Sequence, residues 1–437
     1  MNRFDAIIIG AGPAGITTAL VLAQAGKEVV VLERGEYPGS KNMFGGVLYS
    51  KGLHELIPNF WDKAPVERPV ARWIISGLNK DASFSLDYKN ARYTEAPYNA
   101  FTVLRSKFDS WYARQAEAAG ATLLTETIVE DFIYDQQRVV GVKTGRDDGE
   151  LYADVVVAAD GVNSLAARKG VIKKDLSPYD VSLGVKEILA MPAESINRAF
   201  ALTGNEGAAC TFVGAATQGV PGGGFIYTNK DKLSIGIVVK LSSLSKTGRR
   251  PEDLLEDFKQ HPMIWPLIKE GEIREYLAHL IPEGGQTSSK RLYKDGLLAT
   301  GDAGGFTLST GFRVEGANLA IMSGMAAAET VIRSSRSRDF SEKGLSIYSD
   351  ILRQYGVLAD LEKFRHAPNF LKNPRLYQSY PELVCQISNA LFSVEPGPKK
   401  GIGEMVKEAR KGKQLSRFEI IKEIGRASCR ERVCHRV

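Results

Sequence analysis

The segment Asp5–Arg34 constrains the chain more than any other, because it predicts a strand, a glycine-rich turn, a helix and a second strand in succession. We expect a buried strand over Asp5–Ile9, a helix over Ile16–Ala25 and a second strand over Glu28–Leu32. The turn after the first strand reads GAGPAG and consists of Gly10, Ala11, Gly12, Pro13, Ala14 and Gly15. This order is typical of the first βαβ unit of a dinucleotide-binding domain.

Each glycine of this turn has a physical role in such a unit. Gly10 permits a tight turn, Gly12 lets a diphosphate approach the backbone because it has no Cβ, and Gly15 lets the helix pack against the sheet. The helix start offers N–H groups and a positive dipole end to a phosphate. Glu33, 18 residues after Gly15, is placed to accept hydrogen bonds from a ribose diol. The alternative is an ordinary βαβ turn without a ligand.

Two later buried runs also end beside an acidic residue. The run DVVVAA ends at Asp160 and Gly161, and the run GLLAT ends at Gly301 and Asp302. Ligands of open α/β sheets bind at the carboxyl ends of the strands, so both ends should converge on the glycine-rich turn. A second acid suits a ligand with a second polyol, such as the ribityl chain of FAD. The alternative role of Asp302 is a helix N-cap.

Arg105 is the candidate cation of this site. In the stretch VLRSKFDSWY it would present a guanidinium fork near the diphosphate, and the alternative is a surface salt bridge. No second GxGxxG motif follows a strand, so we expect no dedicated NAD(P) domain.

The fold class expected from these patterns is α/β. We predict a discontinuous, Rossmann-like FAD-binding domain, with a parallel sheet and a β-meander, over residues 1–68, 101–180 and 283–334. Residues 69–100 and 181–282 would form an inserted antiparallel-sheet domain that covers the reactive end of the cofactor.

Within this outline, three further elements are expected. They are a helix over Thr102–Gly120, the β-meander over Ala121–Thr144 and a long alanine-rich helix over Gly316–Ile332.

The end of the chain is predicted to contain a helical region, 335–423, and a non-native tail, 424–437. The tail, IGRASCRERVCHRV, changes composition abruptly and resembles a translated adapter. From residue 425 it holds four Arg and one Glu, so without it the formal charge falls from +6 to +3, which does not favour a nucleic-acid partner. The remaining cysteines, Cys210 and Cys385, predict no metal site, disulfide framework or iron–sulfur cluster held by this chain alone.

Neither a signal peptide nor a spanning helix is expected. The first apolar run is short and leads into the glycine-rich turn, and no stretch approaches 18 uninterrupted apolar residues. We therefore expect the protein in the cytoplasm or on the inner face of the cell membrane. Residues 399–423 carry eight Lys or Arg and four Glu, which indicates either a solvated helical face or a surface that docks on acidic lipid or an acidic ferredoxin.

Several stretches together resemble a known flavoprotein group. GAGPAG with Glu33, VLRSKFDSW, VVVAADGVNS and GLLATGDAGG occur in this order in the group that includes para-hydroxybenzoate hydroxylase and geranylgeranyl reductases. Within it, KNMFGGVLY, GVKE, PGGGFIYTN and EGANLAIMSGMAAAETV are most similar to the electron-transfer flavoprotein–quinone oxidoreductase family, specifically its FixC-type flavoprotein subunit. The similarity runs from residue 1 to about residue 395.

The resemblance implies FAD as the cofactor and assigns residues to its parts. The ADP half would be held by Gly10, Gly12, Gly15, Glu33 and Arg34. The cradle would continue through Arg105, Asp160, Gly161 and Asp302. The isoalloxazine ring would be lined by Gly45, Gly46 and the segment from Gly311 to Gly316. Alternatively, Gly45 and Gly46 form a plain turn, and Arg313 and Glu315 form a structural ion pair.

The resemblance also implies the reaction and the partners. FAD would accept electrons from electron-transfer flavoprotein subunits and pass them to a quinone or a ferredoxin-linked acceptor. A small ferredoxin-like iron–sulfur protein is implied as a separate partner, because this chain lacks the cysteine cluster of family members that act alone. Quinone access is less secure, since the stretch that matches the family's membrane-dipping segment carries Lys80, Asp81, Lys89 and Arg92.

Other functions remain open at this stage. The chain could resemble a geranylgeranyl reductase or an aromatic hydroxylase in activity, or it could be a flavin-bearing subunit that is active only inside a complex. Electron transfer through a flavin demands no catalytic base, so none is assigned. The scattered histidines, His54, His261, His279 and His366, are expected to be structural.

Overall fold

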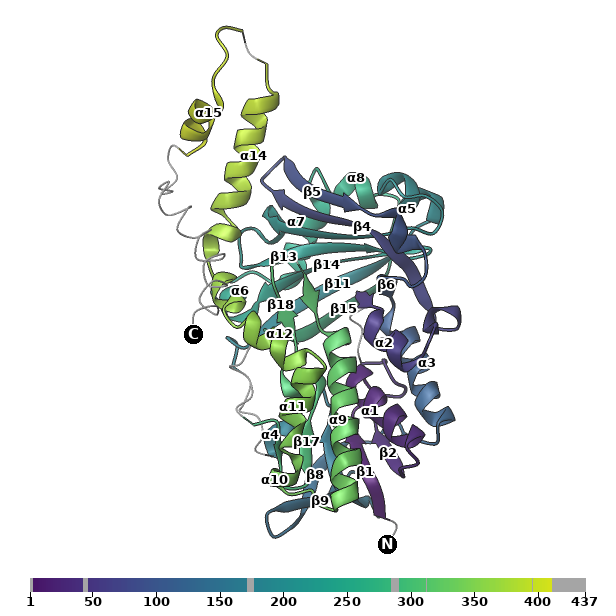
Figure 1. Ribbon diagram of the computed structural model, residues 1–437. Helices are drawn as coiled ribbons and strands as arrows, with labels where there is room; N and C mark the ends of the chain where they lie inside the picture. The colour runs from purple at the N-terminus through teal and green to yellow at the C-terminus, as the bar shows by residue number, and fades with distance from the viewer. Residues whose placement is uncertain are drawn as a thin grey trace.

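A computed structural model describes residues 3–41, 46–170, 177–283, 291–311, 313–394 and 396–410. Within these residues the chain forms two large sheets, one above the other in Figure 1, and a small two-stranded ribbon. The ribbon consists of β18 (Leu308–Ser309) and β19 (Val314–Glu315). The glycine-rich turn belongs to the lower sheet, and the inserted strands belong to the upper one.

The lower sheet has eight strands, of which five are mutually parallel neighbours. Its spatial order is β16 (Tyr293–Lys294), β17 (Leu297–Ala299), β10 (Glu150–Ala158), β1 (Arg3–Ile9), β2 (Val29–Leu32) and β7 (Thr122–Leu124). The hairpin of β8 (Val129–Asp135) and β9 (Arg138–Thr144) continues antiparallel from β10. The predicted β-meander is therefore wrong in its first part, because β7 pairs in parallel with β2 instead of joining the hairpin.

Both faces of this sheet are buried. The side chains of β1 alternate between the two faces of the sheet. Ile8 lies on the face that is covered by α1 (Pro13–Gln24), α3 (Arg105–Ala118) and α9 (Ala317–Ser337). Ile7 lies on the opposite face, which packs against the β8–β9 hairpin and α4 (Leu165–Lys169). Two buried faces explain why these strands read as unbroken apolar runs. Helices α1 and α9 cross closely, since a Cβ on Gly324 would lie 2.5 Å from the carbonyl oxygen of Ala14.

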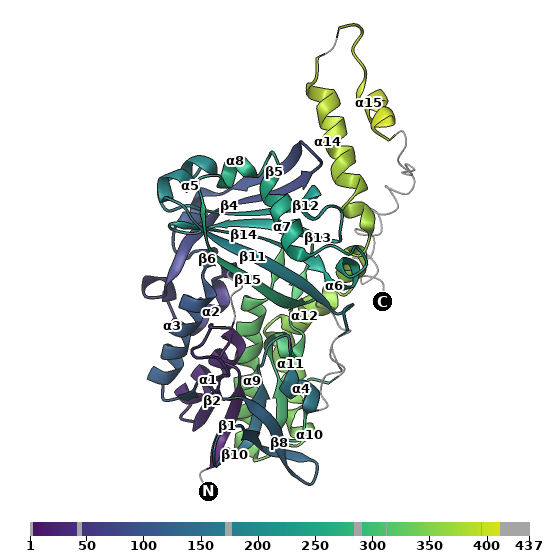
Figure 2. The same cartoon turned by 180° about the vertical axis from the view of Figure 1, so that it is seen from behind.

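The upper sheet has nine strands and is mostly antiparallel. Its spatial order is β15 (Glu272–Pro282), β11 (Val181–Ala190), β14 (Lys232–Lys240), β13 (Gly222–Thr228), β12 (Gly207–Gly214), β4 (Val66–Leu78), β6 (Ala100–Val103) and β3 (Val47–Tyr49), with β5 (Ser83–Lys89) on the free edge of β4. One face is covered by the apolar sides of helices α5 (Ala193–Ala199), α6 (Leu241–Leu244), α7 (Pro251–Gln260) and α8 (Trp265–Ile268). Figures 1 and 2 both place β15 and β11 on the side nearest α2 (Lys51–Leu56) and α9.

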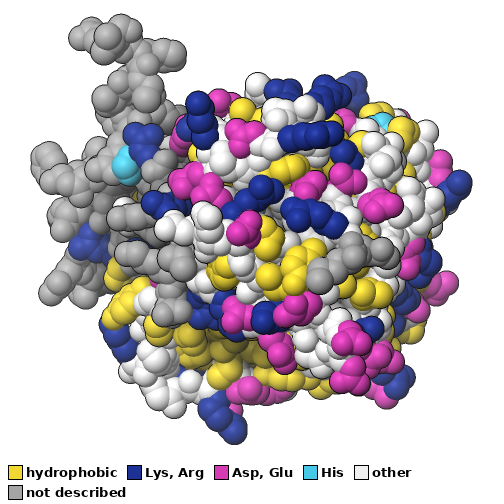
Figure 3. Space-filling view, turned by 90° about the horizontal axis from the view of Figure 1, so that it is seen from below, with side chains coloured by type: hydrophobic (Ala, Val, Ile, Leu, Met, Phe, Trp, Pro, Cys, Tyr) yellow, Lys and Arg dark blue, Asp and Glu magenta, His cyan; other side chains and the backbone are white. Residues whose placement is uncertain are grey.

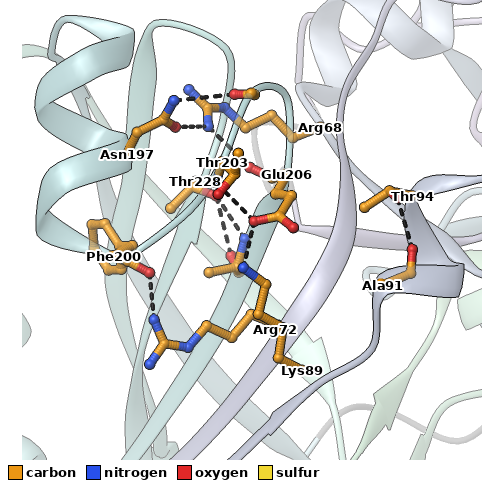
Figure 4. Close-up of polar contacts among 12 residues, drawn as sticks. Arg68, Arg72, Lys89, Ala91, Thr94, Asn197, Phe200, Thr203, Glu206 and Thr228 are labelled. Carbon is orange, nitrogen blue, oxygen red and sulfur yellow. Dashed lines mark hydrogen bonds and ion pairs between the residues drawn. The ribbon is translucent and has the colours of Figure 1, made fainter.

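A buried arginine ties α5 to the upper sheet. Arg68 of β4 is only 1% exposed, and its Nη1 donates to Asn197 Oδ1 (2.5 Å) and to the carbonyl oxygen of Glu206 (2.9 Å). Its Nη2 donates to the carbonyl oxygen of Lys230 at 3.0 Å. Figure 4 shows these contacts beside those of Arg72 and Glu206. The polar side chains between α5 and the upper sheet are therefore hydrogen-bonded to neighbouring protein groups.

The C-terminal part is helical, as predicted for the residues that are described. Its helices are α10 (Glu342–Leu345), α11 (Ile347–Gln354), α12 (Val357–Lys363), α13 (Ala367–Phe370), α14 (Ser379–Phe392) and α15 (Ile402–Ala409). Helices α14 and α15 project from the body in Figures 1 and 2. Residues 411–423 of the predicted helical region and the predicted tail 424–437 lie outside the described residues.

No helix among the described ranges is long and apolar enough to cross a membrane. On the end of the molecule seen in Figure 3, acidic and basic side chains of the described residues are interspersed, and no broad patch of one sign covers that face. Such a face lacks the basic stripe that is typical of a nucleic-acid interface.

Candidate cofactor site

The glycine-rich turn follows β1 directly and lies against the end of β10. Gly10 has φ +102°, and a Cβ there would lie 2.5 Å from the carbonyl oxygen of Ala159. A Cβ on Gly15 would lie 2.0 Å from the carbonyl oxygen of Gly10. Both positions therefore need glycine, one for the turn and one for close packing of α1 on the strand.

The first turn of α1 has backbone N–H groups that no capping side chain of the protein accepts. Gly12 is the N-cap, no side-chain cap hydrogen bond is made, and the first turn contains no acidic residue. Pro13 occupies the first turn, where its missing N–H costs nothing. The helix begins earlier than the predicted Ile16, and this shift brings its free N–H groups to the carboxyl edge of the sheet, where they suit a phosphate.

Glu33 links the end of β2 to the glycine-rich turn. Its Oε2 accepts a hydrogen bond from the Ala11 amide (2.9 Å), and its Oε1 accepts one from the Gly35 amide (2.7 Å). These bonds orient the carboxylate, and each oxygen keeps a further lone pair for a ligand hydroxyl. The neighbouring Arg34 is exposed.

The other two acidic strand ends lie at the same edge. A Cβ on Gly10 would lie 3.2 Å from the Cα of Asp160, whose Oδ2 accepts a hydrogen bond from Ala166 at the start of α4 (2.8 Å). Gly161 follows with φ +72°. A Cβ on Gly301, which has φ +60°, would lie 2.7 Å from the Cβ of Ala14, so this strand end also contacts α1.

Asp302 lies inside the short 3-10 helix Gly301–Gly304 and is half-buried. The N-cap of that helix is Thr300, so the alternative of Asp302 as an N-cap is wrong. The charge of Asp302 acts on Arg105, which brings the two predicted site residues into one electrostatic environment.

Arg105 forms an ion pair that is buried, so the alternative of a surface salt bridge is wrong. Its Nε and Nη2 donate to Oδ1 and Oδ2 of Asp109 at 2.7 Å and 2.6 Å, and the side chains are 16% and 1% exposed. Burial opposes the charge, but Asp109 and then Asp302 outweigh it and raise the pKa of Arg105. Burial also raises the pKa of Asp109, against the attraction of Arg105. Among the described residues, Nη1 of Arg105 makes no hydrogen bond, so it can serve a ligand.

An aromatic face of the upper sheet lies beside Gly46, one of the positions predicted to line the flavin ring. A Cβ on Gly46 would lie 3.5 Å from the ring of Tyr227, which stacks on Phe225 (4.9 Å). Tyr49 stacks on Trp73 (6.0 Å) and lies under the guanidinium of Arg313 (5.8 Å). The residue patterns alone did not single out these aromatic side chains.

The remaining ring-lining predictions fall in the segment before α9. Gly311 has φ +87° and lies near Leu371, where a Cβ would come within 3.2 Å, and Gly316 is the N-cap of α9. Arg313 and Glu315 form an ion pair. Gly45 and Phe312 lie outside the described residues.

Two basic side chains on the upper sheet, Lys186 and His279, were not predicted to lie near the site. Burial, with Arg105 nearby, lowers the pKa of Lys186 to about 7, while Glu275 opposes the shift. Burial also lowers the pKa of His279, and Arg105 and Arg34 add to this effect. The lysine in the otherwise apolar run VSLGVKEIL was the available signal, since a buried lysine is rare without a reason.

Taken together, the donors fit an extended dinucleotide. The α1 amides and the cations Arg34 and Arg105 suit a diphosphate, and two half-buried acids, Glu33 and Asp302, suit sugar hydroxyls. No group of three metal-ligating side chains occurs within the described ranges. His54 accepts a hydrogen bond from the Asn59 amide (3.0 Å), and His261 bonds the carbonyl of Asn79 (2.7 Å), which are structural contacts.

Comparison with known proteins decides the family. A model of FAD dependent oxidoreductases matches residues 5–173. Protein FixC of Escherichia coli (strain K12) is 42% identical over 420 residues, which cover 96% of this chain and 97% of that one. The chain belongs to the FixC family. Protein FixC of Azorhizobium caulinodans is 40% identical over 91% of this chain and 92% of its own. The probable electron transfer flavoprotein-quinone oxidoreductase YdiS of Escherichia coli (strain K12) is 42% identical over 93% of this chain and 94% of its own.

Solved structures agree on the fold. A geranylgeranyl bacteriochlorophyll reductase-like protein from Thermoplasma acidophilum superposes with a TM-score of 0.73 at 20% identity, covering 98% of this chain and 100% of that one. The flavin-dependent brominase Bmp2 gives a TM-score of 0.62 at 18% identity, covering 94% and 99%. The predicted fold class, family and cofactor are confirmed: this FixC-family chain is an FAD-dependent oxidoreductase of electron transfer.

Proposed function

We propose that this chain receives electrons from an electron-transfer flavoprotein into FAD and passes them to a quinone or to a ferredoxin-linked acceptor. The observation that supports the proposal is the glycine-rich turn at the carboxyl edge of the lower sheet, which fits a dinucleotide and lies beside an aromatic face of the upper sheet. No second dinucleotide-binding turn occurs in the part of the chain that the structure describes, so the electrons are best supplied by a protein donor.

In this proposal each part of the cradle binds one part of FAD. The N-terminus of α1, with Gly10 to Gly15, binds the diphosphate, and Glu33 binds the adenosine ribose. Arg105, fixed by Asp109, directs Nη1 toward the diphosphate, and Asp302 accepts from a ribityl hydroxyl. FAD supplies the electron-transfer chemistry, and the protein supplies position and charge.

The other predicted positions complete the cradle. The backbone on one side of the cradle is that of Ala11, Pro13 and Ala14. The other side is formed by Asp160, Gly161 and Gly301, and the exposed Arg34 lies at the edge. Gly45, Gly46, Gly311 and Gly316 would border the ring.

An apolar face on strand β5 favours a lipophilic acceptor. Phe84, Leu86 and Tyr88, which we name the β5 apolar face, alternate along this edge strand and are 50%, 61% and 50% exposed. Tyr88 lies opposite Trp73 of β4, and Trp73 stacks on Tyr49. Aromatic side chains thus lead from the surface toward Gly46.

The charges of this segment do not interrupt the β5 apolar face. Asp87 and Lys89 alternate with it and point to the opposite side of the strand. Asp87 pairs with Arg72 (2.5 Å), and Lys89 pairs with Glu206 (2.6 Å). Of the charged residues that weakened the prediction of quinone access, Lys89 is therefore neutralised on the side away from the apolar face.

The partners we propose are electron-transfer flavoprotein subunits and a small ferredoxin-like iron–sulfur protein. The first follows from the name of the relative YdiS, and the second from the family resemblance. Both cysteines of the described residues, Cys210 and Cys385, are buried and free.

The test is a reconstituted electron-transfer assay. Reduced cognate electron-transfer flavoprotein should bleach the flavin of this chain, and a short-chain quinone analogue should restore its absorbance. A chain that dithionite reduces but that its flavoprotein partner does not would refute the proposed donor. Turnover of an isoprenoid or aromatic substrate without a protein donor would instead favour the reductase or hydroxylase alternative. A yellow but inert chain that gains activity only with co-purified partners would favour the subunit alternative.

A further inference from the structure

The inference concerns Ser323, which lies within α9 and is 0% exposed. Its hydroxyl accepts hydrogen bonds from the Gly301 amide at 3.1 Å and from Thr300 Oγ1 at 3.0 Å, and it donates to the carbonyl oxygen of Ala320 at 3.0 Å. A serine hydroxyl offers one donor and two acceptor lone pairs. Every hydrogen-bonding position of Ser323 is therefore used, and two of them hold the residues that follow β17.

A serine at this position of α9 needs a physical reason. Serine competes with the helix backbone for hydrogen bonds, so it is less favourable than alanine in a helix interior. Its neighbours along the helix, Leu319, Ala326 and Ala327, are buried and apolar. The bond from the Gly301 amide supplies the reason, because a buried N–H without a partner costs free energy. Ser323 is thus the group that satisfies the turn after β17.

Other contacts fix the same strand end. The Tyr348 hydroxyl of α11, also 0% exposed, donates to the carbonyl oxygen of Ala299 at 3.1 Å. Gly301 has φ +60°, and a Cβ there would lie 2.7 Å from the Cβ of Ala14 in α1. The left-handed conformation of Gly301 turns the chain out of the strand. The bond from its amide to Ser323 therefore fixes the direction in which the chain continues.

The next residue along the chain is Asp302, which is half-buried. It belongs to the short 3-10 helix Gly301–Gly304, and the first amide of that helix is the one that Ser323 accepts. The charge of Asp302 acts on Arg105 of α3. Because Asp302 follows Gly301 directly, a shift of the Gly301 amide displaces the carboxylate relative to Arg105 and to a bound ligand.

We propose that Ser323 is a positioning residue for FAD, which holds Asp302 at the ribityl chain through the Gly301 amide and does not itself touch the cofactor. This inference rests on the role proposed above for Asp302. It predicts that Ser323 acts on the flavin half of the cofactor and not on the ADP half, which we assign to the N-terminus of α1 and Glu33.

The chain offers a matched set of variants for the test. Ser323→Ala removes the hydroxyl, Asp302→Ala removes the carboxylate, and the double variant removes both. Ser334→Ala is the control, because Ser334 is a second buried serine of α9, 2% exposed. Its hydroxyl donates to the carbonyl oxygen of Gly344 in α10 at 3.4 Å, and so it serves a different part of the fold.

The experiment is equilibrium dialysis of each apo full-length chain with FAD and, separately, with ADP, a probe that lacks the ribityl chain and the flavin ring. Ser323→Ala should raise the Kd for FAD about 3- to 10-fold and leave the Kd for ADP unchanged. Ser334→Ala should change neither Kd. The double variant should bind FAD as weakly as Asp302→Ala alone, to within about 2-fold, because Ser323 acts through Asp302.

An equal rise of both Kd values in Ser323→Ala would indicate general damage and overturn the inference. A double variant that loses the full factors of both single variants would also overturn it, because the two residues would then act independently. If Asp302→Ala binds FAD normally, the proposed role of Asp302 fails and this inference fails with it. If Asp302→Ala binds FAD weakly and Ser323→Ala binds it normally, this inference alone fails.

A second variant covers a loss of folding. If circular dichroism shows that Ser323→Ala does not fold, Ser323→Cys decides, since a thiol is a weaker acceptor than a hydroxyl. It should raise the Kd for FAD and not that for ADP, and equal effects on both ligands, or on neither, would overturn the inference.

Discussion

The buried pair of Arg105 and Asp109 permits a test that separates a structural role from a cofactor-binding role. Arg105→Met removes the guanidinium and leaves Asp109, 1% exposed, without its two hydrogen bonds. Removing one partner of a buried pair costs about 3–5 kcal/mol of folding free energy. The loss of a hydrogen bond to the charged diphosphate costs a further ~1.5–3 kcal/mol of binding free energy, or roughly a 10- to 100-fold higher Kd for FAD.

The double variant Arg105→Met, Asp109→Leu removes both charges together. Replacing a buried ion pair by apolar side chains of similar volume is often neutral for stability. We therefore expect the double variant to regain most of the free energy of unfolding but to keep the weakened FAD binding. Thermal unfolding of the apo chain and equilibrium dialysis of FAD measure the two quantities separately. A double variant that binds FAD as tightly as the unaltered chain would refute the cofactor role of Arg105.

The same pair has a pH dependence of known sign. Burial raises the pKa of Asp109 in the folded chain. The charge of Arg105 is the strongest effect that lowers this pKa, and Arg105→Met removes it. A folded-state pKa above the unfolded value makes stability greatest below the unfolded pKa, and stability falls as pH rises toward the folded pKa. Arg105→Met should therefore be least destabilised in acid, and a destabilisation that grows as pH falls would contradict this account.

Three further predictions concern other parts of the molecule. Gly15→Ala should lower the free energy of unfolding by about 1–3 kcal/mol, because the new Cβ would lie 2.0 Å from the Gly10 carbonyl oxygen, whereas Gly403→Ala, with nothing within 4 Å, should be tolerated in thermal unfolding. Asp302→Ala should raise the Kd for FAD about 10-fold or more in equilibrium dialysis, and an unchanged Kd would remove Asp302 from the site. Serine at all three positions of the β5 apolar face should slow reoxidation by a quinone analogue but leave flavin reduction unchanged in stopped-flow absorbance, and equal slowing of both steps would contradict the proposed acceptor side.

The position of the glycine-rich turn could be predicted from local sequence patterns. The turn from Gly10 to Gly15 lies within one βαβ unit, so its spacing was readable. The start of α1 at Pro13 was also readable in principle, since proline favours the first turn of a helix. The burial of Arg105 could have been inferred from Asp109, four residues on, which is the spacing of a helical ion pair.

Pairing between strands that lie far apart in the chain could not be predicted from the sequence. Strand β7 pairs with β2, about ninety residues earlier in the chain, and its three residues carry no signal that distinguishes this partner from β8. Lys186 was visible as a lysine in an apolar strand, but only the pairing of β11 with β15 shows that its face meets α3. The aromatic neighbours of Gly46 likewise come from strands far apart in sequence.

The central claim is that separate strand ends of this chain close around one FAD. Titration of FAD into the apo full-length chain, followed by flavin fluorescence, measures this directly. We expect saturation at a single site per chain, and we expect Gly12→Val to abolish that site, because the new side chain would stand where the diphosphate meets the N-terminus of α1. A folded, unaltered chain that cannot be reconstituted with FAD, or a Gly12→Val chain that binds FAD normally, would contradict the account.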